Sequence, residues 1–253
     1  MSAVGRRVTE ALWGLLPPEE QARVREYVLV DAGFGTDQFG LERDALGASY
    51  ALAWWLHENY FRVASRGHDH VPATGSGGVV SNHSGVLPYD GVMIACDVFR
   101  HSAPTRLVRY MVDFFVYDLP FLGVLFRSFG QIPGTRANFD GLIEAGHLVG
   151  LFPEGAKAIA KPRSDHYRML PFSHGHVELA ARHGVPIIPC GVVGAEEQMR
   201  VVANVRPLAK ALGVPYFPLT TTLVFPKPVR YFIVYGEPLH IDPEVLRSMQ
   251  VRA

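Results

Sequence analysis

The chain has 253 residues, of which 48% are hydrophobic and 19% charged, a composition typical of a folded globular protein and not of a disordered one. Its 24 basic and 24 acidic residues cancel, so no basic excess exists to release counterions, which argues against nucleic acid as a partner. The two cysteines, Cys96 and Cys190, are too few for a disulfide framework or a cysteine-rich zinc site, and they suit a reducing compartment.

The first part of the sequence predicts helices. Pro18 followed by two glutamates is typical of a helix start, and it opens a predicted helix over residues 18–30. A second helix, over residues 41–63, is rich in aromatic side chains that either pack onto a core or sit among lipid headgroups. Its most informative rings are Trp54, Trp55 and Tyr60. We therefore expect residues 1–66 to form an N-terminal helical segment that can associate with a membrane.

No stretch predicts a membrane-spanning helix. The longest apolar runs, residues 119–126 and 185–195, are far shorter than the roughly 18–20 residues that a spanning helix needs. Glu10 and the Pro17-Pro18 pair also argue against a secretory signal. The expected location is the cytoplasm, peripheral on the cytoplasmic face of the membrane.

From residue 71 on, short β-rich runs alternate with helical patterns. Strands are expected at residues 78–81, 106–112, 148–152, 186–193 and 230–235, and helices at 91–99, 120–129, 137–145 and 173–183. This alternation predicts an α/β fold, with a mainly parallel sheet covered by helices on both faces after the N-terminal helical segment. We expect residues 67–253 to be one compact domain, with its ligand site where strands end and loops begin.

The loop after the strand at 78–81 holds a histidine, His83, in a polar setting. An imidazole with a pKa of about 6.5 can transfer protons in such a loop. A single loop histidine is also commonly structural. Asp90 follows seven residues later and could fix the tautomer of such a base. On a straight helix the two would lie about 10 Å apart, but Pro88 disfavours helix at Leu87, so residues 83–88 are expected to fold back as a loop.

Three later segments place glycine or proline near a strand end, and two of them add a charged residue. Arg136 follows the turn at 130–135, and Glu154 follows the buried strand at 148–152. The third segment, residues 185–190, is an apolar strand opened by proline. Histidines 68, 70, 174 and 176 have no carboxylate or cysteine at ligand spacing, so no metal site is predicted.

The segment from His83 to Asp90 and the three later segments resemble, in their order and spacing, the four-block pattern of the glycerolipid acyltransferase family. This family includes the glycerol-phosphate and lysophosphatidate acyltransferases. Residues 82–91, 152–162 and 191–197 look most like its monoacylglycerol/diacylglycerol acyltransferase-like branch. The resemblance covers roughly residues 60–240.

The resemblance implies a role for each matching position. His83 matches the catalytic base and Asp90 the acid that orients it. The positions that match acceptor binding are Arg136, Glu154, Gly155 and Lys157. Backbone amides that could stabilise the oxyanion belong to the loop of Asn82, Ser84 and Gly85, or to Gly155. The strand that matches the acyl-donor side comprises Val185, Pro186, Ile187, Ile188 and Pro189.

The sequence departs from the family pattern at two places. Six residues separate His83 from Asp90 where most members have four. Ala156 and Lys157 stand where threonine and arginine are usual, and lysine keeps the charge without the bidentate fork that holds a phosphate. Neutral and phosphorylated acceptors therefore both remain open.

The expected function is an enzyme of lipid metabolism and phospholipid biosynthesis. It would move a fatty acyl group from acyl-CoA or acyl carrier protein, as co-substrate, to a glycerolipid hydroxyl, with no bound cofactor and no metal. Sugar or amine acceptors are compatible with the same base chemistry. The alternatives are an acyl-CoA thioesterase or hydrolase, for which no Gly-x-Ser-x-Gly elbow is present, and a catalytically inactive lipid-binding protein on the same fold.

Overall fold

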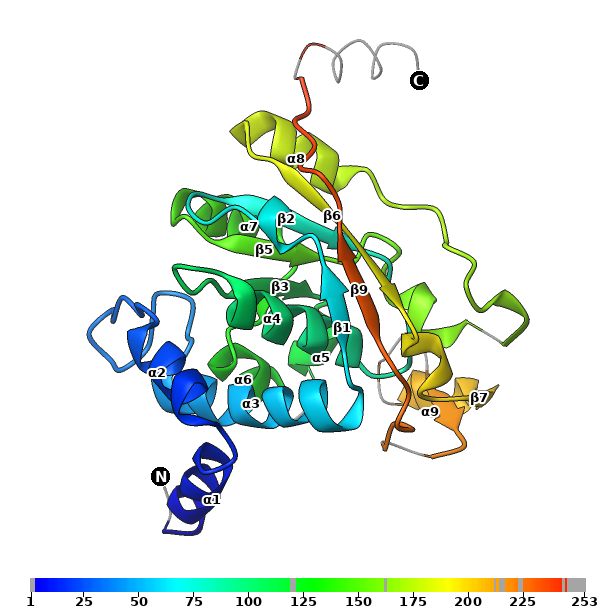
Figure 1. The fold of residues 1–253 in the computed structure, drawn as a ribbon. Coiled ribbons are helices and arrows are strands. Elements are labelled where there is room, and N and C mark those ends of the chain that lie inside the picture. The colour runs from blue at the N-terminus through cyan, green and yellow to red at the C-terminus, as the bar shows by residue number, and fades with distance from the viewer. Residues whose placement is uncertain are drawn as a thin grey trace.

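The computed structural model describes residues 3–118, 122–161, 163–211, 213, 217–222, 225–242 and 244 (Figure 1). The helices are α1 (Ala3–Trp13), α2 (Pro18–Glu26), α3 (Arg43–Trp55), α4 (Tyr89–His101), α5 (Phe115–Asp118), α6 (Leu122–Ser128), α7 (Arg136–Glu144), α8 (Gly175–His183) and α9 (Arg206–Ala211). A π-helical turn covers Leu56–Tyr60, and 3₁₀ turns cover His68–His70, Ala156–Ala160, Arg163–Asp165 and Ala195–Glu197. The strands are β1 (Ala64–Arg66), β2 (Gly77–Ser81), β3 (Val108–Val112), β4 (Ile132–Pro133), β5 (Leu148–Leu151), β6 (Ile187–Val193), β7 (Val201–Asn204), β8 (Pro218–Thr220) and β9 (Phe232–Tyr235).

The described residues form a seven-stranded sheet in the order β1-β9-β6-β2-β5-β3-β4. Strands β6, β2, β5, β3 and β4 are mutually parallel, whereas β9 runs antiparallel to β6 and parallel to β1 (Figure 1). The expected mainly parallel sheet is therefore confirmed. Its edge strand β1 comes from the last residues of the expected N-terminal segment, and β7 and β8 form a separate two-stranded ribbon.

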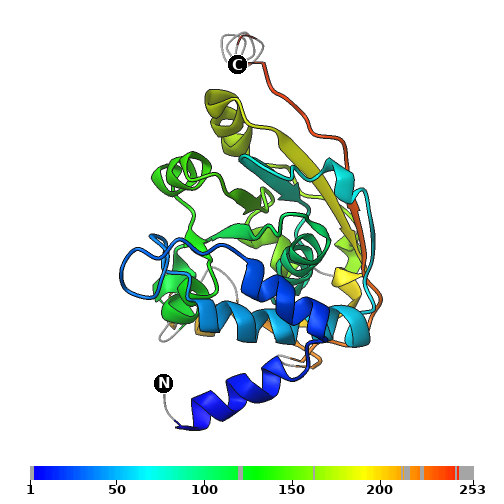
Figure 2. The same ribbon diagram turned by 60° about the vertical axis from the view of Figure 1, so that its left-hand side comes forward.

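Side chains that alternate along the strands pack on the two faces of the sheet. Val79 and Ile188 belong to the core beneath α4, whereas their neighbours Val80 and Ile187 pack against α8 on the other face. Helices α7 and α8 cover that second face, and α3 lies beyond α4 on the first (Figures 1 and 2). The expectation of helices on both faces is confirmed.

Several helix boundaries follow from local chemistry. Helix α2 begins at Pro18 as expected but ends at Glu26 instead of residue 30. The helix expected over 41–63 is α3 followed by the π-helical turn. Helix α7 starts after Thr135, whose hydroxyl accepts a hydrogen bond of 3.0 Å from the Asn138 amide.

The remaining expected elements are present with small shifts at their ends, apart from one that starts outside the described residues. That one is the helix expected at 120–129, together with the first residues of the apolar run 119–126; its described part is α6. The sequence did not predict α1 or the short strands β1, β4, β7 and β8. None of the helices in the described ranges is both long and apolar enough to cross a membrane.

Candidate active site

The candidate site lies at the carboxyl edge of the sheet, between two adjacent loops. Strands β2 and β5 are parallel neighbours, so the loop after Ser81 and the loop after Leu151 leave the sheet at the same edge. The first loop carries His83 and the second carries Glu154. Two segments that lie far apart in the sequence therefore meet here, and the resemblance assigns residues of both to one site.

The imidazole of His83 contacts the carboxylate of Asp90. Its Nδ1 lies 2.7 Å from Asp90 Oδ2, a distance typical of a charge-assisted hydrogen bond. The same oxygen accepts a 2.9 Å hydrogen bond from the Ser84 amide. Asp90 is fully buried in the first turn of α4, where the helix dipole favours a negative charge. The loop thus folds back as expected, and the six-residue spacing is compatible with direct contact.

The ring of Phe152 packs on one face of the His83 imidazole. The rings of His83 and Phe152 stack with centroids 4.2 Å apart and planes 17° from parallel, and Tyr110 stacks on the far side of Phe152. The His83 side chain is 13% exposed, with Nδ1 turned to Asp90. The free nitrogen, Nε2, is therefore the one that can exchange a proton with a ligand.

The pKa of His83 is raised above the ordinary value of an imidazole. Burial by itself would lower the pKa of this group, but the charge and the hydrogen bond of Asp90 raise it, and the charge of Glu154 adds to this effect. The imidazolium that forms when the base takes a proton is therefore stabilised by two carboxylates.

Glu154 holds the histidine loop through its backbone. Its Oε1 accepts a 2.9 Å hydrogen bond from the His83 amide, and its Oε2 accepts a 2.8 Å hydrogen bond from the Leu170 amide. Its side chain is fully buried. The carboxylate that the resemblance assigns to acceptor binding therefore has both oxygens bonded within the protein.

A buried lysine compensates the charge of Glu154. Lys161 Nζ lies 3.7 Å from Glu154 Oε2 and 2.7 Å from Glu196 Oε1, and it donates a 3.1 Å hydrogen bond to the Arg168 carbonyl. Glu196 in turn accepts a hydrogen bond from the Tyr167 amide. This network ties the segment after β5 to the turn after β6.

Two further contacts fix the histidine loop against β6 and the turn after it. The Asn82 side chain donates a 2.9 Å hydrogen bond to the Val192 carbonyl and accepts a 2.8 Å hydrogen bond from the Val192 amide. Gly85 has φ +84°, and a Cβ there would lie 2.1 Å from Nε2 of the buried Gln198. Glycine is thus required at this turn for both conformation and space.

The backbone N–H groups near the imidazole differ in whether they already donate a hydrogen bond. The amides of His83, Ser84 and Gly155 donate to Glu154, Asp90 and the Phe152 carbonyl respectively. Within the described part of the chain, the Gly85 amide has no such acceptor. The Asn82 amide has none there either, so Asn82 and Gly85 are the two loop amides considered for the oxyanion whose N–H donors are still available.

The two basic residues assigned to the acceptor lie at the surface. Arg136 begins α7, is 67% exposed and pairs with Glu178 at 3.3 Å. Strand β4, which precedes it, is three strands from β2, roughly 14 Å at normal strand spacing. Lys157 is also exposed, two residues after Gly155. The structure does not bring either side chain into contact with His83 or Asp90.

The segment from Val185 to Pro189 lies in the middle of the sheet. Ile187 and Ile188 are buried and pack on opposite faces, whereas Val185, Pro186 and Pro189 are partly buried. These side chains contribute to the core beneath the site.

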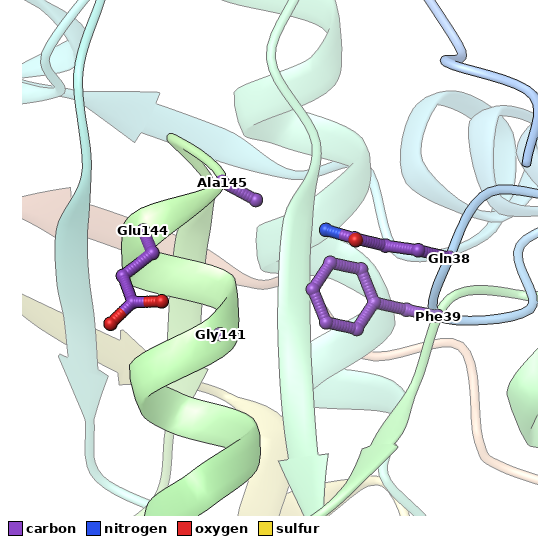
Figure 3. Close-up of a pocket in the computed structure, with 5 residues that line it drawn as sticks. All are labelled: Gln38, Phe39, Gly141, Glu144 and Ala145. Atoms are coloured by element: carbon purple, nitrogen blue, oxygen red, sulfur yellow. The ribbon is translucent and has the colours of Figure 1, made fainter.

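A small cavity adjoins the site, and a larger pocket lies away from it. A cavity of about 10 Å³, room for about one water molecule, adjoins Gly85, Lys161 and Glu196. A pocket of about 330 Å³ lies between the end of α7 and the loop at Gln38 and Phe39 (Figure 3). Because Ala145 in this pocket precedes β5, the pocket lies at the opposite edge of the sheet from His83.

Sequence reasoning missed the contributions of Phe152 and Gln198. Phe152 adjoins a recognised motif, so an aromatic residue at a strand end could have suggested stacking on the histidine. Gln198 supports Gly85 and accepts a 2.6 Å hydrogen bond from the Tyr231 hydroxyl, contacts between distant segments that no local pattern reveals.

The comparisons with known proteins agree with this geometry. The family model described as Acyltransferase matches residues 62–193, which include His83, Asp90 and Glu154. An uncharacterized protein of Mycobacterium leprae is 32% identical over 255 residues, covering 93% of this chain and 70% of its own length. An uncharacterized protein of Mycobacterium tuberculosis is 33% identical over 215 residues, covering 81% of this chain and 60% of its own length.

Two matches carry more informative names. A Bos taurus protein called DGAT1/2-independent enzyme synthesizing storage lipids is 25% identical over 199 residues, covering 78% of this chain and 56% of its own length. The crystal structure of the 1-acyl-sn-glycerophosphate (LPA) acyltransferase PlsC from Thermotoga maritima has the same fold, with a TM-score of 0.52, 14% identity and coverage of 97% of this chain and 91% of that one. The chain belongs to the acyltransferase family.

The contacts of Glu154 predict the effect of Glu154→Gln. An amide has only one acceptor oxygen, so one of the two backbone donors loses its partner and Lys161 loses a counter-charge. We expect the free energy of unfolding to fall by about 1–3 kcal/mol, measured by urea denaturation. The control is Glu197→Gln, at an exposed position in the neighbouring turn. Equal stability of the two variants would contradict this role of Glu154.

Proposed function

We propose that this acyltransferase moves a fatty acyl group from acyl-CoA or acyl carrier protein to the hydroxyl of a glycerolipid. The observation that carries the proposal is the 2.7 Å contact between His83 Nδ1 and Asp90 Oδ2 at the carboxyl edge of the sheet. It leaves Nε2 of a partly exposed imidazole as a proton acceptor, which the chemistry of acyl transfer to a hydroxyl requires.

The proposed reaction is direct transfer without an acyl-enzyme. His83 Nε2 takes the proton of the acceptor hydroxyl as the hydroxyl oxygen attacks the thioester carbonyl carbon. The Gly85 amide donates a hydrogen bond to the oxyanion that forms. When the carbon–sulfur bond breaks, the imidazolium returns its proton to the leaving thiolate. Asp90 stabilises the imidazolium through its hydrogen bond to Nδ1, and Glu154 positions the loop.

The acceptor class depends on which charged side chains are accessible to a ligand. Arg136 and Lys157 are exposed basic side chains on the segments after β4 and β5, and they could meet a phosphate or a polar headgroup. Glu154 is occupied by backbone donors and is not available to an acceptor hydroxyl. A neutral acceptor such as a monoacylglycerol or diacylglycerol needs only the base. The name of the Bos taurus relative, an enzyme synthesizing storage lipids, favours the neutral class.

The direct test is thiol release from palmitoyl-CoA by the purified chain. Separate reactions contain monoacylglycerol, diacylglycerol, lysophosphatidate or glycerol phosphate. We expect release that depends on one of these acceptors and falls by about 10²–10⁴ in His83→Ala, because the general base is lost. The control is His174→Ala, an exposed histidine at the start of α8.

Other outcomes distinguish the alternatives. Release without any acceptor would contradict transfer and identify a thioesterase. Full activity in a folded His83→Ala variant would contradict the mechanism. If palmitoyl-CoA gives no release, palmitoyl-acyl carrier protein is used as the donor with the same acceptors. No release with either donor would point to a lipid-binding protein without catalysis.

We further propose that the protein acts as a peripheral protein on the cytoplasmic face of the membrane. Phe225 is 74% exposed and Trp55 is 38% exposed. The Tyr60 ring stacks on Trp55, and its hydroxyl donates 2.6 Å to the carbonyl of Pro226, next to Phe225. The amide of Lys227 bonds at 2.8 Å to the carbonyl of Gln198, the residue against Gly85. An apolar surface with an exposed lysine is thus connected to the histidine loop.

Vesicle flotation tests this surface with phosphatidylcholine vesicles, alone and mixed with phosphatidylglycerol. We expect the wild-type protein to float with the anionic vesicles and the double variant Trp55→Glu/Phe225→Glu to bind at least about tenfold more weakly, because charged side chains are costly in the interfacial region. Phe34→Glu, which changes a residue 90% exposed in a different loop, is the control. Wild-type protein that stays unbound with both vesicle types would contradict the proposal.

A further inference from the structure

We propose that His68, Asp97 and His101 form a second site, separate from the His83–Asp90 pair, that binds one Zn²⁺ or similar divalent transition-metal ion. The metal-binding atoms of these three residues all lie within 4.8 Å of one another. Zinc binds both imidazole nitrogen and carboxylate oxygen, whereas magnesium and calcium prefer oxygen ligands, so the two imidazoles favour a transition metal. This inference does not depend on the proposed acyl transfer.

The fold brings the three residues together from two segments. Asp97 and His101 are four residues apart on α4, so they lie on one face of that helix. His68 lies in the 3₁₀ turn that follows β1. No pattern in the sequence links His68 with Asp97, which explains why ligand spacing along the chain gave no metal prediction.

The two contacts between an imidazole and the carboxylate already have the spacing that zinc requires of its ligands. His68 Nε2 lies 3.1 Å from Asp97 Oδ2, and His101 Nδ1 lies 3.2 Å from Asp97 Oδ1. Two ligands at about 2.0–2.1 Å from a tetrahedral zinc lie roughly 3.3 Å apart.

The charge of Asp97 also calls for a cation. Asp97 is fully buried, and within the described ranges its ion-pair partners are imidazoles, with no lysine or arginine among them. A buried carboxylate needs a partner of opposite charge, and at this site a bound metal ion can supply it.

The surroundings hold Asp97 in place as they do for a ligand carboxylate. Oδ1 accepts a 2.6 Å hydrogen bond from the Ser65 hydroxyl, and Oδ2 accepts 2.9 Å from the Tyr235 hydroxyl. His57, buried in the π-helical turn, contacts Oδ1 through Nε2 at 3.1 Å. Such outer contacts orient the ligands of metal sites. The side chains of His68 and His101 are 26% and 35% exposed, which gives an ion access from solvent.

Binding requires a rearrangement of the two exposed rings. In the structure they stack with centroids 4.0 Å apart, and His101 Nδ1 lies 2.9 Å from the Asp97 carbonyl oxygen. The ion takes a lone pair from each ring, so both imidazoles must be neutral and turn their edges toward it. Protons therefore compete with the metal, and binding weakens as the pH falls. A bound ion would join α4, which begins at the end of the histidine loop, to the turn after β1.

The experiment uses the full chain after dialysis against a chelator. We expect isothermal titration calorimetry with Zn²⁺ at pH 7.5 to give one ion per chain, weaker binding at pH 6, and no heat with Mg²⁺. Co²⁺ should give the intense visible absorption of tetrahedral coordination, whereas the weak spectrum of hydrated Co²⁺ would overturn the proposal without any variant. No Zn²⁺ binding to the wild-type chain would overturn it as well.

Variants assign the site. His68→Ala and His101→Ala should each weaken Zn²⁺ binding by at least about 100-fold, since even residues that only orient a ligand are worth 10–100-fold. His174→Ala, which changes an exposed histidine just before α8, should bind as the wild type does. Zn²⁺ should raise the Tm of the wild type and of His174→Ala but not of folded His68→Ala. Equal affinity in the cluster variants and the control would overturn the assignment. Since binding is the readout, failure of the proposed acyl transfer leaves this test unaffected.

Discussion

The structure of the site depends on the carboxylate of Asp90 at the start of α4. One of its oxygens receives both the imidazole of His83 and the amide of Ser84, so a single buried group fixes the ring and the backbone of the loop. Glu154 adds a second carboxylate at the His83 amide. Two buried carboxylates beside one histidine favour the imidazolium, which is the form that the proposed base would take in the reaction. The loop thus holds the His83 ring in one orientation and stabilises its protonated form.

Much of this arrangement follows from the sequence. Alternating strands and helices predicted the sheet, and the resemblance assigned His83, Asp90 and Glu154 to one site. The contact between His83 and Asp90 could be expected only as an option, because it depends on the turn at Gly85 against Gln198, which comes much later in the chain. Strands as short as β1 and β4 carry too few residues for a period-two pattern, and they are fixed by pairing with distant partners.

Glu154 shows a further limit of sequence reasoning. Its position beside Pro153 and Gly155 marks it as unusual, and the resemblance assigns it to the acceptor. The structure shows a carboxylate with two backbone partners and a buried lysine. The same limit applies to Asp97, which looks like an ordinary helix residue until the fold surrounds it with three histidines. In both cases the partners come from other elements, and a local pattern cannot specify them.

The central claim is that His83, held by Asp90, is the base of acyl transfer. The measurement that tests it most directly is the pH dependence of kcat/KM for acceptor-dependent thiol release, in the wild type and in Asp90→Asn. The neutral imidazole accepts the proton, and Asp90 raises the pKa of His83, so the wild-type rate should fall on acidification through a pKa above about 6.5. In Asp90→Asn the effect of burial, which lowers the pKa of His83, is no longer offset by the charge of Asp90. The acidic limb should therefore move to lower pH, and the maximal rate should be smaller. An acidic limb that stays at the same pH in both proteins would contradict the claim.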